Sequence, residues 1–432
     1  MKVAAFAPGI KQSTVYVMSA DDISMHFDLN NLTPKQHEEH ESHKDLMGFL
    51  QTSLIGIGKP SDHLMLYEEF EQAPWPARLQ RLAEFFESMG LDTISSAHWH
   101  YHPKHTFYES VAVELPATET VTLYSIAGSN AVLHNDPEAL RVSQDLNSKV
   151  HFAEHAPAFG IPVPDTLVTT KAELNSDRVA AFMQKHGNVV MLKILGLSGA
   201  RNVIAVDSLQ ACIDYVGEFA DDLDVVLQQR LDLTRYTEMT ADLRITPDDI
   251  TISNVRKIMF AEGLWVGNLV GPDVVVTDPH IKEIMRVGEY ARSQGLVLPE
   301  GVNCGIDYFI DGNDVIVTEI NARWTGGLFP TEIIREVGAV KETCVAFVDL
   351  IREDRFDTCL DFFEQHLFDG DSQGSFAVIP VGFSSITQDI GGEKFYFSWQ
   401  VIAGDFEAFK QARRQVLGDG VLMRAETISI EL

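Results

Sequence analysis

A β-hairpin between residues 304 and 320 is the feature that most restricts how this chain can fold. Two apolar runs, at 304–310 and 314–320, flank the turn sequence Asp311-Gly-Asn-Asp314. A short turn rich in Gly, Asn and Asp between such runs is typical of two antiparallel strands joined directly. The two runs must then pair, so that side chains far apart in sequence become neighbours across the strands.

The hairpin carries a set of oxygen-bearing side chains. Counted outward from the turn, Asp307 and Glu319 fall opposite each other to within about one residue. Asn321 lies two residues after Glu319 and therefore points to the same face. Two carboxylates and an amide oxygen of this kind suit Mg²⁺ that carries nucleotide phosphates. Arg323 follows, and its planar guanidinium can pair with a phosphate or a carboxylate. The alternative interpretation is a solvated acidic hairpin beside a surface arginine.

A second element is a buried strand, predicted over 189–194, that ends near Lys193. A loop of small residues follows it and contains Gly196, Ser198 and Gly199. Backbone N–H groups of such a loop can cradle phosphates, and the lysine adds a point charge. The loop matches neither the Walker A pattern nor the Rossmann pattern. A tight turn between two strands is the alternative.

A third element is Lys149, near the start of a helix predicted over 147–155. The helix is followed by the breaker-rich extended segment 160–164. Helix N-termini attract anions, so a lysine at this position can reach a phosphate. The signal is weak by itself and gains meaning only beside the other two elements.

Composition limits the partners of the chain. It has 432 residues with a formal charge of −30, and this charge disfavours nucleic acid and anionic membranes as partners. A phosphate-bearing ligand would need local positive charge from lysines, arginine and Mg²⁺. The four cysteines show no paired spacing, and no apolar run reaches the ~20 residues of a membrane span, so we expect a cytoplasmic protein without a secretory signal.

The order of elements predicts a mixed α/β protein of two to four domains. Strands and helices alternate after residue 160. We expect helices over 136–146, 209–219, 281–294, 330–351 and 405–417, and further strands over 13–18, 224–228, 374–382 and 393–403. The predicted domains are 1–127, 128–356 and 357–432, the last of them small.

Taken together, these elements resemble the ordered motifs of the ATP-grasp superfamily. The resemblance covers about half of the chain, and Glu319-Ile-Asn-Ala-Arg323 after an aspartate-bearing strand is its most specific part. The long N-terminal region and the small C-terminal domain are similar to ligases with a pre-ATP-grasp domain, in particular the peptide ligases of pheganomycin biosynthesis. The implied fold is an ATP-grasp domain between an N-terminal α/β domain and a small C-terminal α+β domain.

The resemblance also implies roles for individual residues. Lys149 and Lys193 would bind ATP phosphates under the loop of Gly196, Ser198 and Gly199. Asp307, Glu319 and Asn321 would hold Mg²⁺, with Mn²⁺ as the alternative cation, and Arg323 would stabilise the transferring phosphoryl group. The hinge against adenine would consist of Gln228, Gln229 and Leu231. Many family members have a glutamate at this hinge, so we expect the ribose contact from Asp232 or a nearby acidic residue instead.

The expected activity is ATP-dependent ligation of a carboxylate to an amine through an acyl phosphate. Amino acids or short peptides are the substrates that the resemblance implies, and a homodimer is the assembly common among similar enzymes. Arg244 and Arg256 are candidates for fixing a substrate carboxylate, with Arg244 placed among the catalytic residues. Two other functions stay open, namely a different ATP-grasp phosphoryl transfer or carboxylation, and nucleotide binding for regulation without turnover.

Two groups of histidines are further candidates for a functional site. His37, His40 and His43 have helical spacing, and His98, His100 and His102 alternate as on one face of a strand. Imidazole clusters can bind a transition metal. We favour a solvated helix face and a polar strand edge, because no cysteine or HExxH motif supports a metal site.

Overall fold

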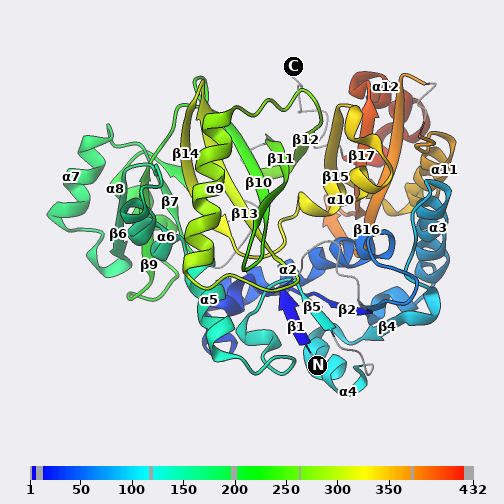
Figure 1. Cartoon of the computed structure of the whole chain (residues 1–432), viewed down its shortest axis with the longest axis horizontal. Coiled ribbons are helices and arrows are strands. Elements are labelled where there is room, and N and C mark those ends of the chain that lie inside the picture. The colour runs from blue at the N-terminus through cyan, green and yellow to red at the C-terminus, as the bar shows by residue number, and fades with distance from the viewer. Residues whose placement is uncertain are drawn as a thin grey trace.

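The computed structural model describes residues 2–5, 13–115, 120–195, 202–261, 264–370 and 374–422. Within them, the chain forms three β-sheets (Figure 1). No helix in the described ranges is long and apolar enough to cross a membrane. The predicted loop residues Gly196, Ser198 and Gly199 lie outside the described residues.

The N-terminal region contains a five-stranded parallel sheet in the order β1-β5-β2-β3-β4. Its strands are β1 (Lys2–Ala5), β2 (Thr14–Val17), β3 (His63–Tyr67), β4 (Trp99–His102) and β5 (Thr120–Leu123). Its helices are α1 (Asp22–His26), α2 (Pro34–Ser53), α3 (Trp75–Ser88) and α4 (Phe107–Glu114). After β2 the chain forms β3 and β4 on one side of that strand, and it then returns to form β5 on the other side. The topological switch point therefore lies between β2 and β5.

A four-stranded antiparallel sheet, which we call the lid sheet, follows in the order β6-β9-β7-β8. It contains β6 (Thr166–Thr170), β7 (Val190–Lys193), β8 (Val203–Val206) and β9 (Asp224–Gln229), with α7 (Asp177–Lys185) and α8 (Leu209–Tyr215). Helices α5 (Pro137–Asn147) and α6 (Lys149–His155) precede it. As expected for a helix start, the Asp136 carboxylate accepts hydrogen bonds from the first-turn amides of Glu138 and Ala139.

The large sheet follows the order β14-β13-β10-β11-β12-β15-β17-β16, and β18 (Val421–Leu422) pairs with β15. Its strands are β10 (Thr237–Ile245), β11 (Ile250–Ala261), β12 (Leu264–Val270), β13 (Val302–Asp311), β14 (Asp314–Asn321), β15 (Cys344–Arg352), β16 (Phe376–Ile390) and β17 (Glu393–Gly404). Helix α9 (Asp278–Ser293) covers one face of β10 and β13 (Figure 1). The opposite face of these strands carries polar side chains.

The helix predicted over 330–351 is wrong in its second half. Helix α10 (Leu328–Glu336) ends early, and Cys344–Arg352 forms strand β15 between β12 and β17. A short apolar run has no periodicity that separates a buried helix from a buried strand, and here pairing on both sides selects the strand. The sheet therefore continues without a break from the hairpin into the C-terminal strands.

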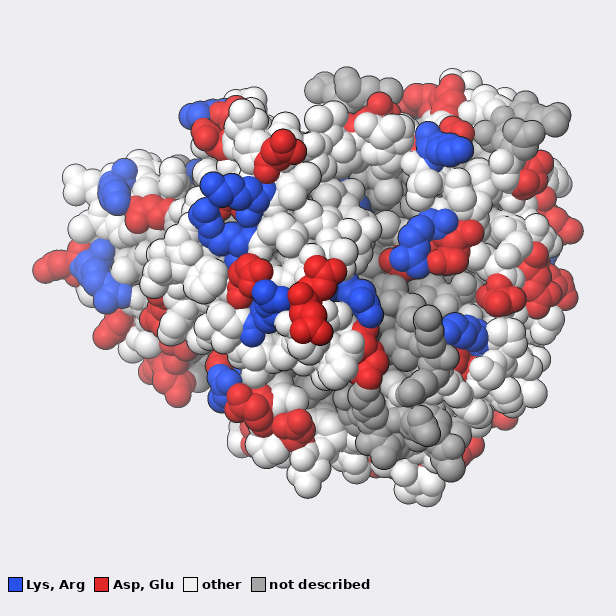
Figure 2. Space-filling view, in the orientation of Figure 1, with Lys and Arg blue, Asp and Glu red and all other residues white. Residues whose placement is uncertain are grey.

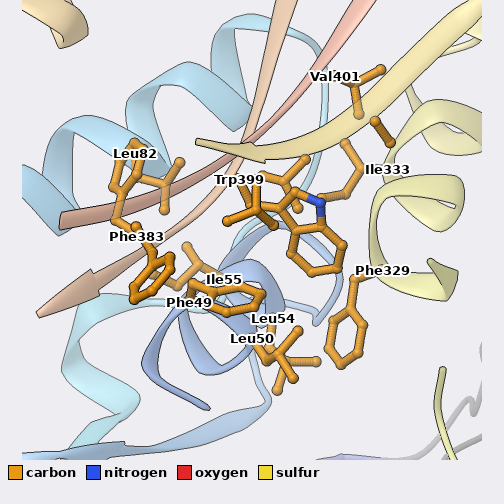
Figure 3. Close-up of a cluster of buried hydrophobic side chains, with 14 of the residues drawn as sticks. Phe49, Leu50, Leu54, Ile55, Leu82, Phe329, Ile333, Phe383, Trp399 and Val401 are labelled. Carbon is orange, nitrogen blue, oxygen red and sulfur yellow. The ribbon is translucent and has the colours of Figure 1, made fainter. Parts of the chain in front are cut away.

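The C-terminal elements pack on the N-terminal region. Helices α11 (Phe356–Gln365) and α12 (Phe406–Leu417) accompany β16 and β17. One buried apolar cluster joins α2 and α3 to these strands and to α10. Figure 3 shows its centre, where Trp399 lies edge-on to Phe49 with ring centroids 5.3 Å apart and close to Phe329. This packing holds the N-terminal sheet against the rest of the molecule.

Candidate active site

Lys149 begins helix α6 and points at the hairpin. Ser148 caps the helix by accepting a hydrogen bond from the amide of His151, and this places Lys149 in the first turn. Its Nζ lies 3.0 Å from Oε2 of Glu319. Both side chains are largely buried, so solvent screens this ion pair only weakly.

The hairpin brings the expected oxygen ligands together. Asp307 and Glu319 are direct cross-strand partners, and a β-bulge follows immediately after Asp307. The Nδ2 of Asn321 donates a hydrogen bond of 3.0 Å to Asp307 Oδ2. On the other side of Asp307, the hydroxyl of its partner on β10, Thr240, also donates to its carboxylate. Asp307 is therefore oriented by both neighbouring strands.

Lys193 and Glu238 complete the charged group. Lys193 ends β7 of the lid sheet and is only 6% exposed. Burial lowers the pKa of its ammonium, while the charge of Glu319 opposes this shift. Glu238 on β10 was missed by sequence reasoning, because its approach to Asp307 depends on the pairing of β10 with β13. The only local signal was its place two residues before Thr240 on the same strand face.

The carboxylates of this group have pKa values shifted from their usual range. Burial, followed by the charge of Glu319, raises the pKa of Asp307 to about 7. Burial, followed by the charge of Asp307, raises the pKa of Glu238 to about 8. Burial would also raise the pKa of Glu319, but Lys149 and Lys193 outweigh it and hold that pKa below its usual value. The two hairpin carboxylates, Asp307 and Glu319, and the amide oxygen of Asn321 are the kind of ligands that a hard divalent cation such as Mg²⁺ takes.

Arg323 lies between the hairpin and the N-terminal region. Its Nε is 3.2 Å from Oδ1 of Asp22, and its Nη1 donates a 3.1 Å hydrogen bond to the hydroxyl of Tyr124. Asp22 begins α1 after β2, and Tyr124 follows β5. Arg323 therefore reaches the carboxyl ends of the two strands that flank the switch point.

A buried polar network holds the turn after Arg323. The Nδ2 of Asn303 donates to both the carbonyl of Arg323 and the carboxylate of Asp242, at 2.8 and 2.9 Å. Asp242 also accepts hydrogen bonds from Thr325 and forms a 2.7 Å ion pair with Arg256. Asp242 and Arg256 are both fully buried. This network ties residues 323–325 to the polar face of the large sheet.

The structure places Arg244 away from the charged group. Arg244 lies four residues beyond Thr240 on β10, about 13 Å along the strand. Its Nη2 donates to the carbonyl of Glu300, and its side chain packs on Gly301. Arg256 is instead the arginine that lies on the polar face near the hairpin.

The predicted hinge residues lie at the end of strand β9 in the lid sheet and just beyond it. Gln228 and Gln229 are the last residues of β9, and Leu231 is buried just beyond them. The Nε2 of Gln228 donates to Thr166 on β6. Asp232 is exposed, and its carboxylate accepts two hydrogen bonds from Thr234 within its own turn.

The histidine groups show a different environment from the one expected. His40 and His43 are buried on α2, so the expectation of a solvated helix face is wrong for these two residues. They lie on the side of α2 that packs into the protein, whereas His37 is exposed. Within the described residues, no group of three or more His, Cys, Asp or Glu side chains has the arrangement of a metal site.

On the visible face of the molecule, acidic side chains are spread widely among fewer basic ones (Figure 2). An anionic ligand would be repelled by the net charge of −30 at long range. The buried Lys149, Lys193 and Arg323 supply the local positive charge that such a ligand would need.

Comparison with known proteins gives the fold. No protein-family model matches the chain, and no curated protein sequence matches it. Many solved structures are similar, and three of them illustrate the similarity at low identity. They are carboxyaminoimidazole ribonucleotide synthase from Aspergillus clavatus complexed with ATP (12% identity, TM-score 0.55, covering 94% of this chain and 98% of that chain); phosphoribosylamine–glycine ligase from Thermotoga maritima (14%, 0.52, 94% and 97%); and the biotin carboxylase domain of the Hydrogenobacter thermophilus 2-oxoglutarate carboxylase with MgADP and bicarbonate (9%, 0.53, 94% and 89%).

These similarities extend over nearly the whole chain. They confirm the mixed α/β ATP-grasp fold expected from the sequence.

Proposed function

We propose that this protein is an ATP-dependent carboxylate–amine ligase that forms an amide through an acyl phosphate. One observation carries the proposal: a helix and two sheets bring two lysines and three carboxylates into one largely buried group, namely Lys149, Lys193, Glu238, Asp307 and Glu319. Two lysines serve the phosphates of ATP, and the carboxylates serve the cation that accompanies them. The solved structures with bound ATP or MgADP support this interpretation, because they share the fold.

Asp307, Glu319 and Asn321, with Glu238 beside them, are the residues that would hold Mg²⁺. When bound, Mg²⁺ would offset the negative charge of the polyphosphate. Lys149 and Lys193 would orient the phosphates from the helix and from the lid sheet. Because both lysines are buried, their charges act with little screening by water.

The chemistry proceeds in two displacements. A carboxylate oxygen of the first substrate attacks the γ-phosphorus of ATP, and ADP leaves. The nitrogen of the second substrate then attacks the acyl carbon, the bond to phosphate breaks, and the nitrogen loses a proton. Arg323 would stabilise the negative charge that develops in both steps. The lid sheet would exclude water from the acyl phosphate.

The substrates would meet Arg323 near the carboxyl ends of β2 and β5. In open α/β sheets, ligands bind outside the strand ends at a topological switch point. Asp22 and Tyr124 already occupy that position beside Arg323. We propose that amino acids or short peptides supply the carboxylate and the amine, and that the enzyme acts in the cytoplasm as a homodimer.

The test is incubation with Mg-ATP and a matrix of amino acids and dipeptides. Released phosphate and new masses would be measured for the wild type, for Glu319→Ala and for the control Glu289→Ala, which changes an exposed glutamate of α9. We expect a product one water lighter than acid plus amine, with one phosphate per product, in the wild type and the control only.

Other results would identify the alternatives. A phosphorylated or carboxylated product without an amide would replace ligation by another ATP-grasp reaction. ATP binding without phosphate release across the whole matrix would favour a nucleotide-binding regulator.

A further inference from the structure

The guanidinium of Arg323 meets its charged and side-chain partners in the N-terminal region rather than in its own sheet. Its side chain is 10% exposed and meets Asp22 at Nε and Tyr124 at Nη1, with the Tyr124 ring also under its Cζ at 5.5 Å. Within the described part of the chain, Nε makes no hydrogen bond, so its 3.2 Å approach to Asp22 is an ion pair, and Nη2 is left to meet a ligand. The large sheet fixes the backbone of Arg323 through the hydrogen bond from Asn303 to its carbonyl, and in the turn after β14 its Nη1 also donates to the carbonyl of Trp324 at 3.3 Å.

Asp22 is itself buried. It is 3% exposed and opens α1, directly after the loop that leaves β2. Its neighbour Asp21 is fully buried and accepts hydrogen bonds from the hydroxyls of Tyr108 and Ser129. On the other side of Asp22, His43 Nδ1 lies 3.6 Å from Oδ2. The carboxylate therefore lies between Arg323 and His43.

This pairing has an electrostatic reason. A buried guanidinium needs a nearby counter-charge, and removing one partner of a buried pair leaves the other uncompensated. Asp307 and Glu319 also act on Arg323. Without Asp22, the guanidinium would be drawn toward these carboxylates, where the phosphates and their cation are to bind.

We propose that Asp22 is the positioning residue for Arg323, and that the N-terminal region thereby completes the active site instead of only covering it. Asp22 holds the guanidinium at the strand ends of β2 and β5, with one donor directed to the transferring phosphoryl group. This inference rests on the proposed function. Asp22 lies outside the expected motifs, and its proposed role concerns the rate of phosphoryl transfer rather than the affinity for ATP.

The test is a double-mutant cycle with Asp22→Asn, Arg323→Lys and the double variant, measured as phosphate release from Mg-ATP with the substrate pair of the wild type. Asp22→Asn should lower kcat by about 10- to 100-fold, because a catalytic group misplaced by about 1 Å loses that much rate. Its KM for Mg-ATP should change by less than about 3-fold. In the Arg323→Lys background the same change should cost less than about 2-fold. Asp22→Glu should recover part of the rate.

The matched control is Asp62→Asn, which alters a buried N-terminal carboxylate that accepts from the amides of Thr14 and Lys59. Its effect should be the same with and without Arg323→Lys. The inference is overturned if Asp22→Asn leaves kcat unchanged. It is also overturned if Asp22→Asn lowers kcat by the same factor in the Arg323→Lys background as in the wild type. A wild type that releases no phosphate overturns the proposed function together with the inference. An active wild type with an additive cycle overturns the inference alone.

Discussion

Oε2 of Glu319 lies 3.0 Å from Nζ of Lys149, and this ion pair joins the start of helix α6 to strand β14. On the neighbouring strand, Asp307 lies directly opposite Glu319. One carboxylate therefore faces a lysine and a second carboxylate at the same time. In the proposed function, Glu319 is therefore the residue that links the bound cation to the lysines.

Replacing Glu319 by Gln should weaken cation binding. The side chain keeps its size but loses the charge that a hard divalent cation requires. We expect the affinity for Mn²⁺ to fall at least about 10-fold, measured by electron paramagnetic resonance during a Mn²⁺ titration in the presence of ADP. Glu289→Gln on the exposed side of α9 is the control and should leave the titration unchanged. Equal affinity in Glu319→Gln and the wild type would remove Glu319 from the ligand set.

Of the two adjacent glycines, only Gly327 should be intolerant of alanine. A Cβ at Gly327 would lie 2.5 Å from Oδ1 of Asn268 and 2.8 Å from the Arg256 guanidinium, whereas one at Gly326 would come no nearer than 3.4 Å to Trp265. Gly327→Ala must therefore push the turn that carries Arg323 off the polar face. We expect kcat to fall about 10-fold or more for Gly327→Ala, and about 2-fold or less for Gly326→Ala. Similar rates for the two variants would contradict the close packing of this turn.

Trp399 should be a major contributor to stability. It is fully buried where the C-terminal strands meet α2 of the N-terminal region (Figure 3). Trp399→Ala should lower the free energy of unfolding by about 3–5 kcal/mol, seen as a lower urea midpoint. Val113→Ala, at a residue 92% exposed, should change it by less than about 0.5 kcal/mol. An unchanged midpoint in Trp399→Ala would mean that this junction contributes little.

Because of Asp21, the free energy of unfolding should fall as the pH rises. Burial raises its pKa from 3.8 to about 7, so between these values the folded protein keeps a proton that the unfolded chain releases. Its contribution to the free energy of unfolding therefore falls from about pH 4 to about pH 7 and is constant above. Asp21→Asn removes this titration, so the variant should gain stability relative to the wild type across that window, by a few kcal/mol at most. Urea unfolding at pH 5 and pH 8 measures the difference, and a gap that does not widen with pH would contradict it.

Local chemistry accounts for what the sequence predicted correctly. The hairpin that opposes Asp307 to Glu319 follows from its Gly- and Asn-containing turn, where Gly312 adopts a φ of +58°. Lys149 falls in a first helical turn because Ser148 caps it. Each of these features depends on residues within about ten positions of one another, so the sequence contains all that is needed.

Tertiary structure decided the rest. Glu238 joins the charged group only because β10 pairs with β13, and Asp22 meets Arg323 only because the N-terminal sheet packs against the turn after the hairpin. The strand Cys344–Arg352 was expected as helix because pairing with β12 and β17, not periodicity, selects its conformation. Such contacts join residues far apart in the chain. Their partners are chosen by the packing of whole sheets, which no local pattern records, whereas turns and helix caps are set by neighbours in sequence.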